Sequence, residues 1–248
     1  MLSFGKFKLH YWPILSCCWC IISFITTYII SICNGHVYPF FPYISDTGTK
    51  PPESCVFAQL LNIEAILLGI TLYIRYKQTE ISIACTENVI RSSWNAVSLS
   101  VGWMACLGIS IVANFQETNL LSVHLVGAFM IFGIGTIYLL LQARITLAFG
   151  KLTGSIHRAK KWLVLLRLLM ATCLVPLFFI TTVCGVISAQ QFTGESIEYW
   201  TEEDGGFTLR LIGTFTEWTA VFLMMFFVLT YTSEFKIIQF KDIVFQSV

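Results

Sequence analysis

The sequence predicts an all-α integral membrane protein with six transmembrane helices packed in one bundle. Hydrophobic residues make up 56% of the 248 residues and charged residues only 12%, about half the charged share of a soluble domain. Six stretches reach the roughly 20 apolar residues that a bilayer-crossing helix needs. Intrinsic disorder is excluded because it requires low hydrophobicity and high charge. We therefore expect a single membrane domain over residues 1–248.

The predicted spans follow the apolar runs along the chain, at about 11–33, 55–74, 94–113, 120–149, 162–188 and 211–232. The first has no charged residue from Tyr11 to Cys33 and is too long for a signal-peptide core, which favours a retained span. Pro176 predicts a kink in the fifth span. The third span has a small residue at every fourth position, and such a stripe lets a neighbouring helix pack closely. Its members are Ser98, Gly102, Cys106 and Ser110.

Basic residues predict how the bundle is oriented. An even number of spans places both termini on one side of the membrane, and 13 of the 15 Lys and Arg fall on that side. Only Lys50 and Arg210 lie on the other. Because loops rich in Lys and Arg stay in the cytosol, both termini are predicted to be cytosolic. Residues 34–54 and 189–210 then form lumenal or extracellular loops.

Composition also argues against several classes of function. The formal net charge is +1, so no bulk electrostatic field favours nucleic acid as a partner. The nine Cys lie mostly inside apolar runs and do not form paired CxxC motifs, which disfavours a disulfide scaffold or a zinc module. The sequence has no Gly-rich phosphate loop, Ser-His-Asp order or HExxH motif. We predict no metal or other cofactor, and the lipid bilayer as the main partner.

The first outer loop, residues 34–54, is the most informative stretch. It holds four of the six prolines, Pro39, Pro42, Pro51 and Pro52, and a proline-rich loop loses less entropy when it becomes ordered. Turn-forming residues follow at 45–49, after four aromatic side chains between positions 38 and 43. Two interpretations are equally supported: a stiff cap on the outer face of the membrane, or a plain connector with interfacial aromatic residues.

The same loop carries a recognisable motif. Residues 42–49, Pro-Tyr-Ile-Ser-Asp-Thr-Gly-Thr, followed by Pro-Pro-Glu-Ser at 51–54, resemble the damage-regulated autophagy modulator (DRAM) family. The motif positions are Pro42, Tyr43, Ser45, Asp46, Thr47, Gly48, Pro52 and Glu53. A second specific match is Ala-Asn-Phe-Gln-Glu at 113–117, and His124 and Glu217 are weaker ones. Glu64 departs from the family pattern, which has a small residue there.

The resemblance implies a non-enzymatic regulator of autophagy in lysosomal or endosomal membranes. Such a protein would act through the bilayer or through other lysosomal membrane proteins. The wider six-span superfamily includes proteins of GPI-anchor lipid remodelling. It therefore implies, as the alternative, a protein that handles or organises lipids, located in the plasma membrane or Golgi. A small-solute transporter or channel is the third alternative.

Polar side chains gather in the predicted outer half of the bundle and in the loop above it. This candidate cluster comprises Asp46, Glu53, Asn114, Gln116, His124 and Glu217. The favoured interpretation is a structural network in which His124 and Glu217 pair across helices and hold the loop. One alternative is a lumenal site for a small molecule, a lipid headgroup or a proton. The other is a metal-assisted hydrolase or transferase site with His124, Asp46 and Glu217 as ligands, a thin ligand set for zinc.

The inner half of the bundle is expected to hold no comparable cluster, only Lys and Arg placed to snorkel toward the headgroups. Glu64 lies near the membrane midplane. We expect it to be a neutral, hydrogen-bonded carboxyl with a structural role, with Asn62 or a facing helix as its partner.

The cysteines suggest two further features. Cys17, Cys18 and Cys20 lie deep in the first span, so packing is favoured over palmitoylation. Cys33 and Cys55 bracket the outer loop. An oxidising lumen would permit a disulfide between them, and the sequence leaves that question open.

Overall fold

The computed structural model describes residues 8–86, 89–153 and 157–239, and all regular secondary structure in these segments is helical. The long helices are α1 (Tyr11–Cys33), α2 (Glu53–Ala84), α3 (Ser92–Asn114), α6 (Lys161–Gln191) and α7 (Phe207–Leu229). α4 (Glu117–Phe129) continues through a π-helical turn, η3 (Met130–Ile134), into α5 (Gly135–Gly150), and α8 (Thr232–Phe235) follows α7. The described chain thus has six helical segments long and apolar enough to cross a membrane, which confirms the predicted fold class.

Two helices, α2 and α6, run past the positions at which the predicted spans ended. α2 has 32 residues, about 48 Å at 1.5 Å per residue, against a hydrocarbon core of about 30 Å. α2 continues past Arg75, the residue that follows the predicted span, and the Arg75 side chain is buried inside the bundle. α6 likewise continues through Pro176 as one helix, so the proline does not end it.

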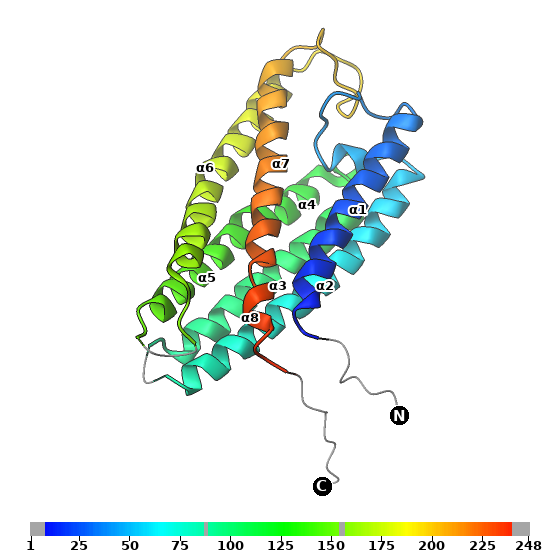
Figure 1. Ribbon diagram of the computed structural model, residues 1–248. Coiled ribbons are helices and arrows are strands. Elements are labelled where there is room, and N and C mark those ends of the chain that lie inside the picture. The colour runs from blue at the N-terminus through cyan, green and yellow to red at the C-terminus, as the bar shows by residue number, and fades with distance from the viewer. Residues whose placement is uncertain (1–7, 87–88, 154–156, 240–248) are drawn as a thin grey trace, which may run out of the picture.

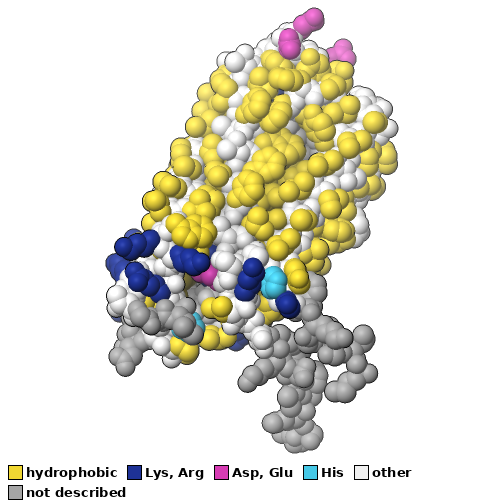
Figure 2. Space-filling model, in the orientation of Figure 1, with side chains coloured by type: hydrophobic (Ala, Val, Ile, Leu, Met, Phe, Trp, Pro, Cys, Tyr) yellow, Lys and Arg dark blue, Asp and Glu magenta, His cyan; other side chains and the backbone are white. Residues whose placement is uncertain are grey.

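The two ends of the bundle differ in chemistry. Both ends of the described chain lie together at one end of the bundle (Figure 1), here called the basic end. Figure 2 shows Lys and Arg gathered at the basic end, Asp and Glu projecting from the opposite end, and a broad hydrophobic surface between them. Residues 34–52 and 192–206 connect the helices at that opposite end, here called the capped end. Lys6 and Lys241, which belong to the predicted cytosolic side, lie outside the described residues.

The hydrophobic surface is made of large side chains that a soluble protein would bury. Ile22, Ile66 and Phe179 are 54%, 63% and 59% exposed. Because exposed apolar patches of this extent are rare on soluble monomers, these side chains are placed to face lipid.

The small-residue stripe predicted on α3 lies against α2 and α5. A Cβ atom on Gly102 would lie 2.7 Å from Cδ1 of Leu72 and 2.9 Å from Cδ2 of Tyr138. Ser98 is fully buried, and its Oγ accepts a hydrogen bond of 2.8 Å from Nε2 of Gln142. Small side chains therefore let three helices approach closely, as the four-residue spacing predicts.

The apolar core has two main parts. The larger involves α2, α3, α5, α6 and α7, with Leu174, Phe227 and Tyr231 fully buried within it. The smaller lies beneath the capped end and includes Phe24, Ile44, Phe57, Leu61 and Val112. The polar groups described next lie at the outer margins of these two cores.

Candidate functional site

The cap loop, residues 34–52, is fastened to α7 by its backbone. The Ile44 N–H donates to Oε2 of Glu217 at 2.9 Å, and Nε1 of Trp218 donates to the Pro42 carbonyl at 3.0 Å. Two adjacent residues of one helix thus hold two positions of the loop. The loop is packed against the bundle at this point.

The motif in the cap loop also stabilises itself. Oδ2 of Asp46 accepts a hydrogen bond of 2.8 Å from the Tyr43 N–H, just before a single turn of 3₁₀ helix, η2 (Asp46–Gly48). Oγ1 of Thr47 lies 3.1 Å from Oγ1 of Thr27 on α1. Asp and Thr are the residue types that bond to nearby backbone in turns, so the motif shapes the loop and joins it to α1.

Gly48 provides a sharp test of this packing. A Cβ atom there would overlap the ring of Phe57, and overpacking of this kind costs about 1–3 kcal/mol. We expect Gly48→Ala to lower the free energy of unfolding by that amount, measured by thermal unfolding in detergent. Gly69→Ala is the matched control, because the nearest contact of its added methyl would be Nε1 of Trp103 at 3.9 Å. Equal stability of the two variants would contradict the packing argument.

A buried ion pair joins the cap loop to the start of α7. Nη2 of Arg210 donates to Oδ2 of Asp46, and both side chains are buried. The Arg210 guanidinium lies 5.0 Å from the centre of the Tyr43 ring and 4.5 Å from that of Trp200. Burial, reinforced by the charge of Glu217, raises the pKa of Tyr43, so its phenol stays neutral. The cap therefore encloses one paired cation between two aromatic rings.

A second layer of polar contacts lies further out. Nζ of Lys50 donates to Oε1 of Glu198 at 2.7 Å and ties the cap loop to residues 192–206. Glu53 is fully buried and is bonded by the ring of His36 and, at 3.2 Å, by Nδ2 of Asn34. Burial is the largest single influence and raises the pKa of Glu198, but the hydrogen bonds from Lys50, Ser196 and the backbone, with the charge of Lys50, together hold that pKa below its usual value.

The Lys50–Glu198 pair predicts a small, pH-dependent effect. Lys50 is 42% exposed, so Lys50→Met should cost at most about 1 kcal/mol at neutral pH. Because the folded-state pKa of Glu198 is lowered, the contribution is complete above the ordinary glutamate value of about 4.3. It is lost as the pH falls through the lowered folded value. Thermal unfolding of the unmodified protein and of Lys50→Met should be measured from neutral to acidic pH. We expect their difference in stability to vanish in acid. A difference that grows in acid would contradict the assignment of the ion pair.

The structure does not bring the six predicted cluster residues into one site. Asp46, Glu53, His124 and Glu217 are buried, but each has its own partner. Asn114 is exposed and bonds to Asn62 at 3.2 Å. Oε1 of Gln116, the residue just before α4, accepts from Asn119 of that helix.

The predicted pairing of His124 with Glu217 is wrong. Nδ1 of His124 lies 2.7 Å from the carbonyl oxygen of Phe115, whereas Glu217 accepts from the cap loop. His124 follows a break in the helical backbone at Leu120, and its ring bonds to the preceding turn instead of reaching across. Within the described ranges, no group of three or more His, Cys, Asp and Glu side chains is arranged to hold a metal ion.

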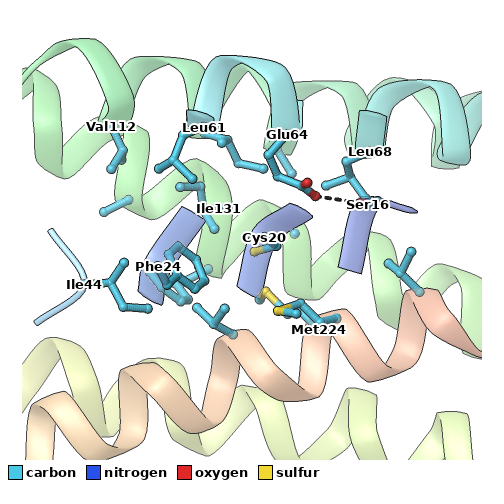
Figure 3. Close-up of a pocket in the computed structure, with 18 of the residues that line it drawn as sticks. Ser16, Cys20, Phe24, Ile44, Leu61, Glu64, Leu68, Val112, Ile131 and Met224 are labelled. Carbon is cyan, nitrogen blue, oxygen red and sulfur yellow. Dashed lines mark hydrogen bonds between the residues drawn. The ribbon is translucent and has the colours of Figure 1, made fainter. Parts of the chain in front are cut away.

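An apolar cavity of about 150 Å³ lies beneath the cap, inside the bundle. Its wall comes from α1, α2, α3, α4, η3, α5 and α7, and its polar lining includes Ser16, Glu64, His124 and Glu217. Figure 3 shows Glu64 between Leu61 and Leu68 on α2, with a hydrogen bond to Ser16 and with Met224 on the opposite wall.

Of the two partners predicted for Glu64, the structure shows the facing helix and not Asn62. Oε1 of Glu64 accepts a hydrogen bond of 2.6 Å from Oγ of Ser16 on the facing helix α1, and Oε2 is buried without a hydrogen-bond partner in the described structure. Asn62 bonds instead to Ser110 at 2.7 Å and to Asn114. Asn62 and Glu64 are two positions apart on α2, and their side chains bond to different helices, α3 and α1.

The basic end holds a polar network that sequence reasoning missed. Arg75 and Arg167 both donate to Oε2 of Glu234, at 2.8 and 2.6 Å. Arg75 also donates to Oε1 of Gln142 at 2.9 Å and to Oε1 of Gln78 at 2.5 Å. Both arginines are at most 2% exposed, so the prediction that the inner-half cations snorkel is wrong for this pair. Gln142, a polar residue within an apolar span, was the available signal.

The cysteines are all free in the described structure. Cys33 and Cys55 are both exposed, with no disulfide between them, while Cys17 and Cys20 are buried and Cys18 is exposed. Packing accounts for the two buried thiols.

Six helical segments long and apolar enough to cross a membrane define a polytopic membrane protein, here with a packed cap above an apolar cavity. The chain belongs to the family described as the Frag1/DRAM/Sfk1/Cwh43P N-terminal domain, whose sequence model matches residues 8–238. The resemblance to the DRAM family seen in the cap-loop motif is thereby confirmed.

Relatives with curated names point the same way. The chain is 38% identical to DNA damage-regulated autophagy modulator protein 2 of Homo sapiens, over 90% of this chain and 82% of that protein. It is 34% identical to DNA damage-regulated autophagy modulator protein 1 of Mus musculus, over 90% of each. It is 41% identical to Modulator of macroautophagy TMEM150B-B of Xenopus laevis, over 54% of this chain and 58% of that protein. No solved structure matches the chain.

Proposed function

We propose that this DRAM-like membrane protein modulates autophagy from lysosomal or endosomal membranes and catalyses no reaction of its own. The observation that carries the proposal is its similarity, over nine-tenths of the chain, to proteins named as autophagy modulators. The buried polar residues of the cap support a non-enzymatic role, because Asp46, Glu53 and Glu217 are each engaged in holding the fold. The protein would act through the bilayer or through contacts with other lysosomal membrane proteins.

We propose further that both termini lie in the cytosol. The basic end carries most of the described Lys and Arg, together with both ends of the described chain (Figures 1 and 2), and such loops favour the cytosolic side. Lys50 and Arg210, the two cations of the capped end, are both bound to carboxylates, so neither is available as a free topological signal.

The experiment combines location, orientation and autophagic flux. A C-terminal tag would be imaged in cells against lysosomal and plasma-membrane markers. Protease digestion of intact organelles would test whether the tag lies on the cytosolic side of the membrane. Flux would be measured as the change in autophagosome turnover when lysosomal degradation is blocked, with and without the protein. We expect lysosomal residence, a digestible tag and changed flux. Plasma-membrane residence with unchanged flux would sink the proposal.

The non-enzymatic part needs its own variants. His124→Gln and Glu217→Gln each remove an ionisable group that lines the cavity while keeping hydrogen-bonding capacity. If the protein works by contacts, both should retain the flux effect at equal expression. Loss of the effect in variants that melt like the parent would instead indicate chemistry at these residues.

A further inference from the structure

The cavity is long and narrow. On α7 its lining runs from Glu217 to Val228, eleven residues and therefore about 16 Å. On α2 it runs from Phe57 to Leu72, about 22 Å by the same rise. A volume of about 150 Å³ spread over such a length leaves room for one slender chain. It does not suit two acyl chains side by side.

The wall is apolar and is not closed by its own side chains. Leu68, Ile131 and Met224 line the cavity and remain partly exposed, although they pack against the core. An engineered apolar cavity of about this volume stays dry and takes up small hydrocarbons. Met224 and Met225 add flexible, polarisable surface that adapts to a guest.

Glu64 supplies the polar feature that gives the cavity a chemical preference. Its side chain is 5% exposed, one oxygen is bonded to Ser16, and Oε2 is buried without a hydrogen-bond partner. Among the described residues that line the cavity the charged types are two glutamates, with no Lys or Arg. An unpaired carboxylate in such surroundings is costly. A proton on Oε2 would remove the charge, but it would leave a buried donor without an acceptor among the described residues.

We propose that this cavity binds a single-chain lipid amine. Its ammonium would donate to Oε2 of Glu64, a charge-assisted bond of the strongest kind, and its hydrocarbon chain would lie against Leu68, Ile131 and Met224. The acidic lining disfavours lipids that carry phosphate. The inference stands on the cavity and Glu64 alone and holds whether or not the protein modulates autophagy.

The test uses the full-length protein in phosphatidylcholine nanodiscs and a long-chain primary amine that carries a photoreactive diazirine and an alkyne. A matched probe has a hydroxyl in place of the amine. We expect saturable labelling by the amine probe, competition by the unlabelled amine, and crosslinks mapping to cavity residues of α2 or α7. Glu64→Gln should reduce amine labelling at least about tenfold, the typical effect of removing a charged partner, and leave labelling by the alcohol probe nearly unchanged.

Two controls separate charge from volume. Glu80→Gln removes a carboxylate of the same helix whose side chain is 43% exposed and should leave labelling intact. Ala105→Leu fills the cavity without touching Glu64 and should block both probes. Thermal melting of each variant tests whether it is folded. The crosslink positions are mapped on the unmodified protein, so that part of the test does not depend on any variant. Unsaturable labelling, crosslinks outside the cavity, or equal labelling by both probes that Glu64→Gln does not alter would each overturn the proposal.

Discussion

Glu234→Gln is expected to lower the free energy of unfolding by about 3–5 kcal/mol, the cost of leaving buried charges without their partner. One oxygen of Glu234 accepts from both Arg75 and Arg167. Both guanidinium groups also lie 4.9 Å from the centre of the Tyr231 ring. Removing the carboxylate therefore leaves two cations in close proximity inside the bundle, with only neutral partners. Denaturant unfolding in detergent, followed by tryptophan fluorescence, measures the loss.

The matched control is Glu80→Gln. Oε2 of Glu80 accepts from Lys77 at 2.7 Å, but both side chains are more than 40% exposed. The loss there should be at most about 1 kcal/mol. A second variant tests the cause: adding Arg167→Met to Glu234→Gln removes one unpaired cation and should restore part of the lost stability. If Glu234→Gln cost no more than Glu80→Gln, the network would not hold the α7–α8 end in place.

Arg210→Met is expected to have the second largest effect and to act first on the cap. It leaves the Asp46 carboxylate buried without its cation, again at a cost of about 3–5 kcal/mol. Asp46 also accepts the Tyr43 N–H, so the strain falls on the cap loop. Local opening of a loop costs less free energy than unfolding of the whole protein. We therefore expect faster hydrogen exchange at Tyr43 and Ile44, and faster proteolysis within residues 34–52. Both changes should appear before any change in the helices.

Two comparisons make this result specific. Lys50→Met breaks the half-exposed ion pair of the same loop and should barely change exchange at Tyr43. The double variant Asp46→Asn with Arg210→Met removes both charges and should recover part of the stability, since the amide oxygen can still accept from the loop backbone. Uniform destabilisation of the whole bundle by Arg210→Met, with no local opening, would contradict a separate role for the cap.

The partners and the burial of the basic residues could be predicted from the sequence only in part. The positive-inside count singled out Lys50 and Arg210 as exceptions, and in the structure both are ion-paired. The sequence could not name their partners, because Arg210 and Asp46 are 164 positions apart. It placed Arg75 and Arg167 at the headgroups. A cation near the end of an apolar run gives the same sequence pattern whether its side chain reaches the headgroups or is buried in the bundle. The side-chain directions of packed helices decide between these outcomes.

The sequence by itself determined the all-α class, the six spans and the close packing along α3. Each of these depends on a local property, the length of an apolar run or the spacing of small residues. The cap-loop motif determined the family, since its residues are contiguous. Tertiary structure alone decided that His124 turns back to Phe115, that Ser16 faces Glu64, and that a cavity remains beneath the cap. These features depend on how helices distant in sequence are rotated against one another, and hydropathy does not specify that rotation.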